Sequence, residues 1–274
     1  MKFLDKIYEA IGQWIEERLE RPVAGYEPFT PSDPITLKRN LQTGDVLLVE
    51  GNQKVSVAIK YLTQSTWSHA AIYVGDALAM PTSGGEPNTL IEVNLGEGAV
   101  AAPLSKYENF NTRICRPVGL STQDRQKLVK FVVDRLGTDY DTRNIFDLAR
   151  YLLPTPPVPV RWRRRLIALG SGEPTRAICS TLIAQAFQCV SYPILPRIER
   201  PGDELGRVKG YTSREIHHIR HHSLFAPRDF DLSPYFEVIK PTIQDGFDYK
   251  SLTWGDEGPG EGSLGEGRRI YEKD

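Results

Sequence analysis

One stretch of this 274-residue chain, Thr66–Gly75, reads TWSHAAIYVG. Small, β-branched and aromatic residues follow His69, and Gly75 ends the run, so the stretch predicts a strand with a histidine at its head. Far downstream, Ile178–Phe187 reads ICSTLIAQAF and predicts an apolar helix near whose start Cys179 lies. A thiol at a helix start and an imidazole on a strand are the two parts of a cysteine nucleophile and its base. The sequence therefore predicts an enzyme.

The overall composition restricts the class of protein. With 274 residues and 40% hydrophobic content, the chain can bury one sizeable core. A formal net charge of −1 creates no global field that attracts nucleic acid, so no nucleic-acid partner is expected. Three cysteines, an odd number, do not suggest a disulfide framework and fit a reducing compartment. No cofactor is expected.

The distribution of apolar residues bears on location. Met1–Lys6 leads directly into charged residues without an apolar segment, so no signal peptide is expected. No apolar run reaches the length needed to cross a bilayer. The expected location is cytoplasmic, with peripheral membrane contact through the N-terminal segment as the alternative.

Apolar residues recur at helical spacing in this N-terminal segment. They are Leu4, Ile7, Tyr8, Ile11, Trp14, Ile15 and Leu19. The spacing predicts an amphipathic helix whose apolar stripe packs on the body of the protein. A helix lying in a membrane interface is the alternative, which the many glutamates on its polar face disfavour.

Local patterns predict the remaining elements. Strands are expected at residues 44–49, 69–75, 89–93, 98–102 and 113–118, and helices at 54–62, 122–136 and 144–153, with Thr122 as the N-cap of the second helix. Phe225–Ile239 is expected to be irregular chain with a short strand.

The expected organisation has three parts. Residues 1–34 form the amphipathic helix and a loop, 35–240 the main domain, and 241–274 a tail rich in Gly and acidic residues. Within the main domain, residues 154–172 combine a proline-rich connector with the run RWRRR. This run is either a solvated helix face or a site for a phosphate or acidic head group.

Cys179 is the candidate nucleophile. Only a thiolate attacks a carbonyl well, so its pKa must lie below the usual range. The positive end of a helix dipole and an imidazolium from His69 would both lower it. Backbone N–H groups of the same helix turn could stabilise an oxyanion. The alternative is a small buried hydrophobic residue, which the polar neighbours Arg176 and Ser180 disfavour.

A catalytic imidazole needs a third group that sets its tautomer and orientation. Glu92, on the expected strand 89–93, is the candidate, with Asn94 and Asp76 as the other choices. The alternatives are that Glu92 faces solvent and that His69 is a buried core histidine. The residues expected to form a pocket around His69 are Trp67, Ser68 and Tyr73.

The other histidines cluster at His217–His222, which reads HHIRHH. If this run is helical, His217 and His221 share one face at a spacing that suits a metal. No carboxylate or cysteine completes the pair nearby, so surface histidines are favoured and no metal site is expected.

Taken in order, five motifs resemble a known family. They are Thr43–Leu48 (TGDVLL), Trp67–Gly75 (WSHAAIYVG), Ile91–Glu92, Gly137–Asp141 (GTDYD) and Cys179–Leu182 (CSTL). This order resembles the circularly permuted branch of the NlpC-type papain-like cysteine hydrolases, the YiiX-like proteins, which are related to the lecithin:retinol acyltransferase group. Ala226–Pro234 (APRDFDLSP) resembles the closing segment of that family. The resemblance covers roughly residues 41–239.

The resemblance implies an α+β fold, in which the cysteine helix packs across a small antiparallel sheet beside additional helices. It implies Cys179 as nucleophile, His69 as base and Glu92 as the third member, and it extends the expected pocket to Tyr140 and Ser180. Many relatives carry an aromatic residue just before the cysteine and Glu two residues after it. This chain instead has Ile178 and Thr181, which alters the expected shape of the pocket.

The leading functional hypothesis is a cysteine hydrolase or acyltransferase that acts on an amide or ester through a thioester. The resemblance implies peptide-like or lipid-like acyl substrates. The alternative is a catalytically inactive module that holds a ligand or partner in the same cleft. A third hypothesis is a membrane-surface protein that depends on the N-terminal helix and the arginine run.

Overall fold

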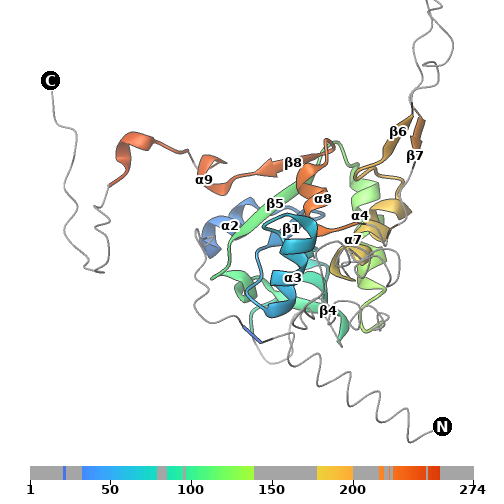
Figure 1. Cartoon of the computed structure of the whole chain (residues 1–274), viewed down its shortest axis with the longest axis horizontal. Coiled ribbons are helices and arrows are strands. Elements are labelled where there is room, and N and C mark those ends of the chain that lie inside the picture. The colour runs from blue at the N-terminus through green and yellow to red at the C-terminus, as the bar shows by residue number, and fades with distance from the viewer. Residues whose placement is uncertain are drawn as a thin grey trace, which may run out of the picture.

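A computed structural model describes residues 21–22, 33–78, 85–94, 97–138, 178–199, 216–218, 222, 225–244 and 246–253 (Figure 1). Its strands are β1 Val46–Val49, β2 His69–Tyr73, β3 Asn88–Asn94, β4 Gly98–Pro103, β5 Thr112–Pro117, β6 Arg197–Glu199, β7 Ile216–His218 and β8 Phe236–Ile239. Its α-helices are α2 Pro34–Asn40, α3 Lys54–Thr63, α4 Thr122–Val133, α7 Ile178–Cys189, α8 Pro227–Leu232 and α9 Pro241–Gln244. Short 3₁₀ helices are η1 Gly75–Ala77, η2 Leu104–Tyr107 and η4 Tyr249–Ser251.

Six strands form one antiparallel sheet in the order β4-β3-β2-β1-β5-β8. In the pairing of β1 with β2, Val49 lies opposite His69 and Val46 opposite Ile72. Strands β1 to β4 are consecutive along the chain and adjacent in the sheet, whereas β5 pairs with β1 on its other side. The expected small antiparallel sheet and α+β class are confirmed.

Alternating residues of the strands build two separate cores, one on each face of the sheet. On one face, Leu48 and Ile72 pack with apolar residues of α4, α7 and α8. On the other face, Leu47 and Ala71 pack with apolar residues of α2 and η2. This alternation follows from the two-residue period of a strand, which sends successive side chains to opposite faces.

The cysteine helix α7 contacts β2 and β3 and lies beside α4 (Figure 1). Most of its side chains are buried, including Leu182, Ile183 and Phe187, which are fully inaccessible. The ring of Phe187 packs edge-on against Phe236 of β8, with 5.1 Å between centroids. These buried side chains pack α7 against one face of the sheet.

Several sequence expectations differ from the structure. Helix α4 ends at Val133 rather than at residue 136, and its N-cap is Ser121, whose hydroxyl accepts the Asp124 N–H at 3.1 Å. Ile216–His218 form a strand paired with β6, so the helical alternative for the histidine run is wrong there. Helix α8 falls in a segment expected to be irregular, and helix α2 in a segment for which no element was predicted. Both begin with a proline, which suits the first helical position as well as a loop.

Other expectations lie outside the described residues. These are the N-terminal helix, most of the following loop, the helix at 144–153, the insert at 154–172 and the tail beyond residue 253. In the part of the chain that the structure does describe, no helix has both the length and the apolar character required to span a bilayer.

Candidate active site

The sheet register brings His69 and Glu92 together. Glu92 of β3 lies opposite Ala71 of β2, so His69, two residues earlier on the same face, is its diagonal neighbour. The imidazole Nε2 and the Glu92 Oε2 are 3.0 Å apart. Glu92 therefore faces the imidazole rather than solvent, and its side chain is 0% exposed.

Helix α7 delivers Cys179 to the same point. Cys179 is the second residue of α7 and is 5% exposed. Its thiol hydrogen-bonds the His69 side chain and also interacts with the Ala70 N–H and the Ser180 hydroxyl. Because Nε2 of His69 is engaged by Glu92, the other ring nitrogen is the one available to the thiol. His69 is thus held between a thiol and a carboxylate.

Helix η2 supplies two more groups to Glu92. The ammonium of Lys106 donates to Oε1 of Glu92, and the hydroxyl of Tyr107 donates to Oε2. Tyr107 is buried, and its ring lies 6.0 Å from the His69 ring. The Lys106 side chain is 40% exposed, whereas that of His69 is 20% exposed. Solvent therefore reaches the site from the side of His69 and Lys106.

The charges of these groups stabilise one another. Burial disfavours the imidazolium of His69, but hydrogen bonds to Cys179 and Glu92 and their negative charges raise its pKa to about 10. Burial also disfavours the Glu92 carboxylate, but His69 and then Lys106 lower its pKa to about 2. Burial alone would raise the pKa of Cys179, yet His69, the Ala70 N–H and Ser180 bring it below its ordinary value. This arrangement favours a thiolate–imidazolium pair at neutral pH.

Trp67 and Ser68, expected in the pocket, are both buried next to the site and have structural partners. The indole Nε1 of Trp67 donates to Asp231 at 3.1 Å, and the Arg113 guanidinium lies 4.8 Å from the ring centroid. The hydroxyl of Ser68 accepts the Gly51 N–H at 2.9 Å. These contacts fix the chain just before His69.

The structure does not bring every expected residue to His69. Tyr73 lies at the other end of β2, about 14 Å along the strand at roughly 3.4 Å per residue. Asp76 lies beyond it in η1, and the side chain of Asn94 donates to Glu97 at 2.9 Å. Tyr140 lies outside the described residues. Of the choices for the third group, Glu92 is the one that meets the imidazole.

Lys106 and Tyr107 were not expected from the sequence. They stand in a short connection after Pro103, where neither residue forms part of a motif. A buried carboxylate requires donors, so the expectation for Glu92 did imply that some partners exist. Only the pairing of β3 with β4 shows that η2 returns to Glu92.

A comparison with protein families gives a match over part of the chain. Residues 40–151 match the family described as the permuted papain-like amidase enzymes, YaeF/YiiX, C92 family. The predicted resemblance to the permuted YiiX-like proteins is confirmed over this segment. The matched segment contains His69 and Glu92, whereas Cys179 lies beyond it and joins them through the fold. Because the family consists of amidase enzymes, the match supports cysteine hydrolase activity.

A solved structure shows a weaker likeness. It is described as metalloprotein yiiX from Escherichia coli O157:H7, with 16% sequence identity and a TM-score of 0.41. The similarity covers 73% of this chain and 96% of that chain. No curated protein sequence matches this chain. Among the residues that the structure describes, no group of three or more His, Cys, Asp or Glu side chains could hold a metal ion.

Proposed function

We propose that this protein is a cysteine amidase in which Cys179 is the nucleophile, His69 the general acid and base, and Glu92 the residue that orients the imidazole. The observation that carries the proposal is the continuous contact from the Cys179 thiol through His69 to the buried Glu92 carboxylate. A nucleophile, its base and a third orienting group in this order form a unit known from several unrelated folds.

In the first half of the reaction, the thiolate of Cys179 attacks the carbonyl carbon of the amide. The resulting tetrahedral oxyanion collapses, the carbon–nitrogen bond breaks, and the His69 imidazolium gives its proton to the leaving amine. The products of this half are a free amine, a thioester on Cys179 and a neutral imidazole.

In the second half, His69 takes a proton from water as the water attacks the thioester. Collapse of this intermediate releases a carboxylic acid and restores the thiolate–imidazolium pair. Glu92 keeps the imidazole oriented through both halves, because its position is fixed by Lys106 and Tyr107 as well as by His69. An amine or alcohol acceptor in place of water would convert the same steps into acyl transfer.

The oxyanion is assigned to the first turn of α7. N–H groups in the first turn of a helix have no partner four residues earlier, and the helix dipole places positive charge there. Cys179 lies in this turn. Its own N–H is therefore the donor proposed for the oxyanion, as in other acyl-transfer enzymes.

Alkylation of the three cysteines tests the proposal without a known substrate. If accessibility alone set the alkylation rate, Cys189, which is exposed, would react faster than Cys179, which is 5% exposed. The fraction of thiol present as thiolate acts in the opposite direction. The pKa of Cys179 is lowered, whereas burial raises the pKa of both Cys115 and Cys189 above the ordinary value. Since only the thiolate reacts, we expect iodoacetamide at pH 7 to label Cys179 at least about tenfold faster than Cys189. Peptide mapping by mass spectrometry measures the three rates.

The variant Cys189→Ser provides the matched control, since it removes the accessible thiol and leaves the proposed site intact. Its Cys179 should react at the wild-type rate. If all three cysteines react alike, and only above about pH 8, the proposed nucleophile is wrong and a binding role for the cleft is favoured.

Lys106 is proposed as a positioning residue that acts through Glu92. Its charge lowers the pKa of Glu92, so Lys106→Met should raise that pKa and protonate the carboxylate at a higher pH. The acid limb of the pH profile for Cys179 alkylation should move upward, with a rate loss of less than about tenfold at pH 7 because water can replace a partly exposed ammonium.

Lys106→Arg should restore the wild-type profile, since it retains the charge. Lys127→Met is the control, because Lys127 is an exposed partner of Asp124 on α4, at 3.1 Å. An unshifted acid limb in Lys106→Met would remove Lys106 from the site.

A further inference from the structure

Helix α3 carries an exposed apolar surface. Val57 is 47% exposed and Tyr61 is 73% exposed. Residues four positions apart lie on the same face of a helix, so these two side chains form one apolar strip along α3. Val55, Ser56 and Thr63 are buried and attach the helix to the body of the protein. The α3 strip is therefore a surface that another apolar segment can cover.

The start of α3 is paired with a segment from near the N-terminus. Pro22 forms an isolated antiparallel bridge with Gln53, the residue before α3. The N–H of Lys54, the first residue of α3, donates to the Arg21 carbonyl at 3.2 Å. In an antiparallel pairing, the residues before Pro22 lie beside those after Gln53. The bridge therefore directs the chain that precedes Arg21 along α3.

The chain that precedes Arg21 has an apolar stripe of its own. These residues lie outside the described part of the chain, and their sequence predicts an amphipathic helix with Leu19, Ile15 and Ile11 on one face. A lone helix of this length is marginal in water, because most helical stability in proteins comes from packing of the apolar face. The stripe therefore requires a surface to pack on.

The spacing of the stripe matches that of the α3 strip. At about 1.5 Å of rise per residue, Val57 and Tyr61 lie about 4.5 and 10.5 Å beyond the start of α3. In a helix that ends at Arg21, Leu19 and Ile15 would lie about 3 and 9 Å before that end. Two helices that run antiparallel from the bridge would thus bring the two apolar pairs to matching heights.

The charges of the two segments are complementary. Helix α3 reads KVSVAIKYLT, with two lysines and no acidic residue. Residues 1–20 contain five acidic and three basic residues. This excess of negative charge suits the lysines of α3 and is repelled by an anionic bilayer, so the charges favour α3 over a membrane surface.

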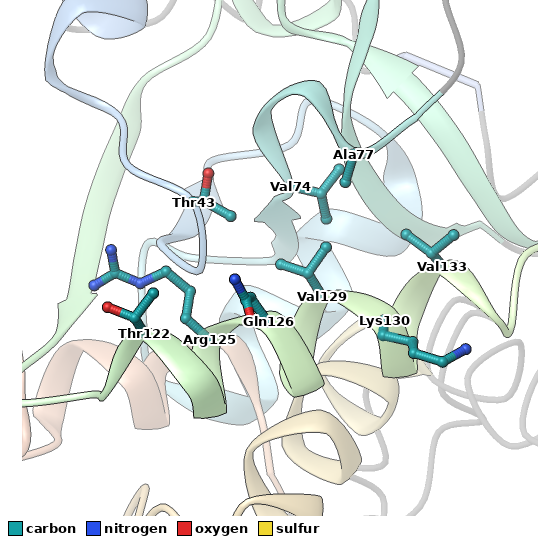
Figure 2. Close-up of a pocket in the computed structure, with 9 residues that line it drawn as sticks. All are labelled: Thr43, Val74, Ala77, Thr122, Arg125, Gln126, Val129, Lys130 and Val133. Atoms are coloured by element: carbon teal, nitrogen blue, oxygen red, sulfur yellow. The ribbon is translucent and has the colours of Figure 1, made fainter.

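A second apolar surface lies at a different place. Figure 2 shows a groove between α4 and the chain after β2, in which Val74 and Val129 face each other. Thr43, which precedes β1, also lines this groove, whereas α3 follows β1 and precedes β2. The groove and the α3 strip therefore lie at opposite ends of these two strands. The bridge at Pro22 places the N-terminal segment at the α3 end.

We propose that residues 4–19 pack as a helix on the α3 strip, antiparallel to α3, with Leu19 near Val57 and Ile15 near Tyr61. The occupant of this surface is thus the protein's own N-terminal segment, rather than a bilayer or a second copy of the chain. The proposal is independent of the role assigned to Cys179.

Hydrogen exchange of the full chain, followed by mass spectrometry without lipid, tests this packing. Amides in residues 4–19 should exchange at least about tenfold more slowly than those of an unstructured chain. The double variant Val57→Ser, Tyr61→Ser should lose this protection, because it removes the apolar contact from α3. Both replaced side chains are exposed, so exchange in the strands of the sheet should stay at the wild-type rate.

Ile35→Ser is the matched control, since Ile35 is 69% exposed but lies on α2. It should leave the exchange of residues 4–19 unchanged. The proposal is overturned if these residues are unprotected in the wild type, if the double variant keeps the protection, or if Ile35→Ser loses as much of it. Protection that falls on dilution would assign the contact to a second copy. Protection that appears only with vesicles containing phosphatidylserine would assign it to a membrane surface, and either result also overturns the proposal.

Discussion

The variant Cys179→Ala is expected to lose acyl-enzyme formation completely and to lose turnover by a factor on the order of 10⁶, as when the nucleophile of a serine protease is removed. Alanine fits the space of a 5% exposed cysteine, so the fold should survive the change. The loss of activity would therefore report chemistry rather than unfolding.

An activated ester makes this result measurable before a substrate is known. With p-nitrophenyl butanoate, the wild type should release an early burst of one p-nitrophenol per chain, and the protein mass should increase by one butanoyl group. Hydroxylamine should remove the group, as expected for a thioester. Cys189→Ala should retain the burst, since Cys189 lies at the opposite end of α7. A burst that persists in Cys179→Ala would assign the nucleophile to another residue.

The elements that the sequence predicted correctly are those whose apolar residues recur with a clear strand or helix period. The strand headed by His69 and the apolar helix of Cys179 both appear where their side-chain periodicity places them. The helix α2 was missed because Asp33 and Pro34 suit a turn as well as a helix start. In the structure the Asp33 carboxylate accepts the Thr36 N–H at 2.8 Å and caps that helix.

The prediction of the site residues was limited by contacts between segments that are far apart in the sequence. Glu92 could be chosen because a carboxylate among apolar strand residues requires a reason to be buried. Tyr73, further along the same strand, was expected near His69, but its distance along β2 excludes contact. Lys106 and Tyr107 depend on how β4 returns beside β3, a register that no local pattern encodes.

The site also shows why a buried ionic group can be retained. Glu92 is inaccessible to solvent and would be costly as an isolated charge. It is instead surrounded by His69, Lys106 and Tyr107, and burial together with the charge of Glu92 raises the pKa of Tyr107 well above its usual value, so that the phenol remains a donor. A neutral residue at position 92 could fill the space, but it could not balance an imidazolium.

The second large effect concerns pH. In the wild type, His69 lowers the pKa of Cys179, so alkylation of this thiol should decline less between pH 9 and pH 7 than alkylation of a thiol with the ordinary pKa. In His69→Gln, burial remains and the imidazolium is lost, so the pKa of Cys179 should rise to at least its ordinary value of 9.0. Two pH units below that value leave at most about 1% thiolate, so alkylation at pH 7 should be at least about 100-fold slower than at the alkaline plateau of the variant.

The free energy of unfolding should also change in His69→Gln, and the pKa shifts of His69 and Glu92 determine at which pH. The raised pKa of His69 stabilises the folded wild type below about pH 6.5, and this contribution is lost as the pH rises through about 10. The lowered pKa of Glu92 stabilises it above about pH 4.5, and this is lost as the pH falls toward 2. Denaturant unfolding should therefore show the largest deficit of His69→Gln between about pH 4.5 and 6.5, where both contributions are present. A variant whose alkylation profile and stability both match the wild type would mean that His69 and Cys179 do not form an ion pair.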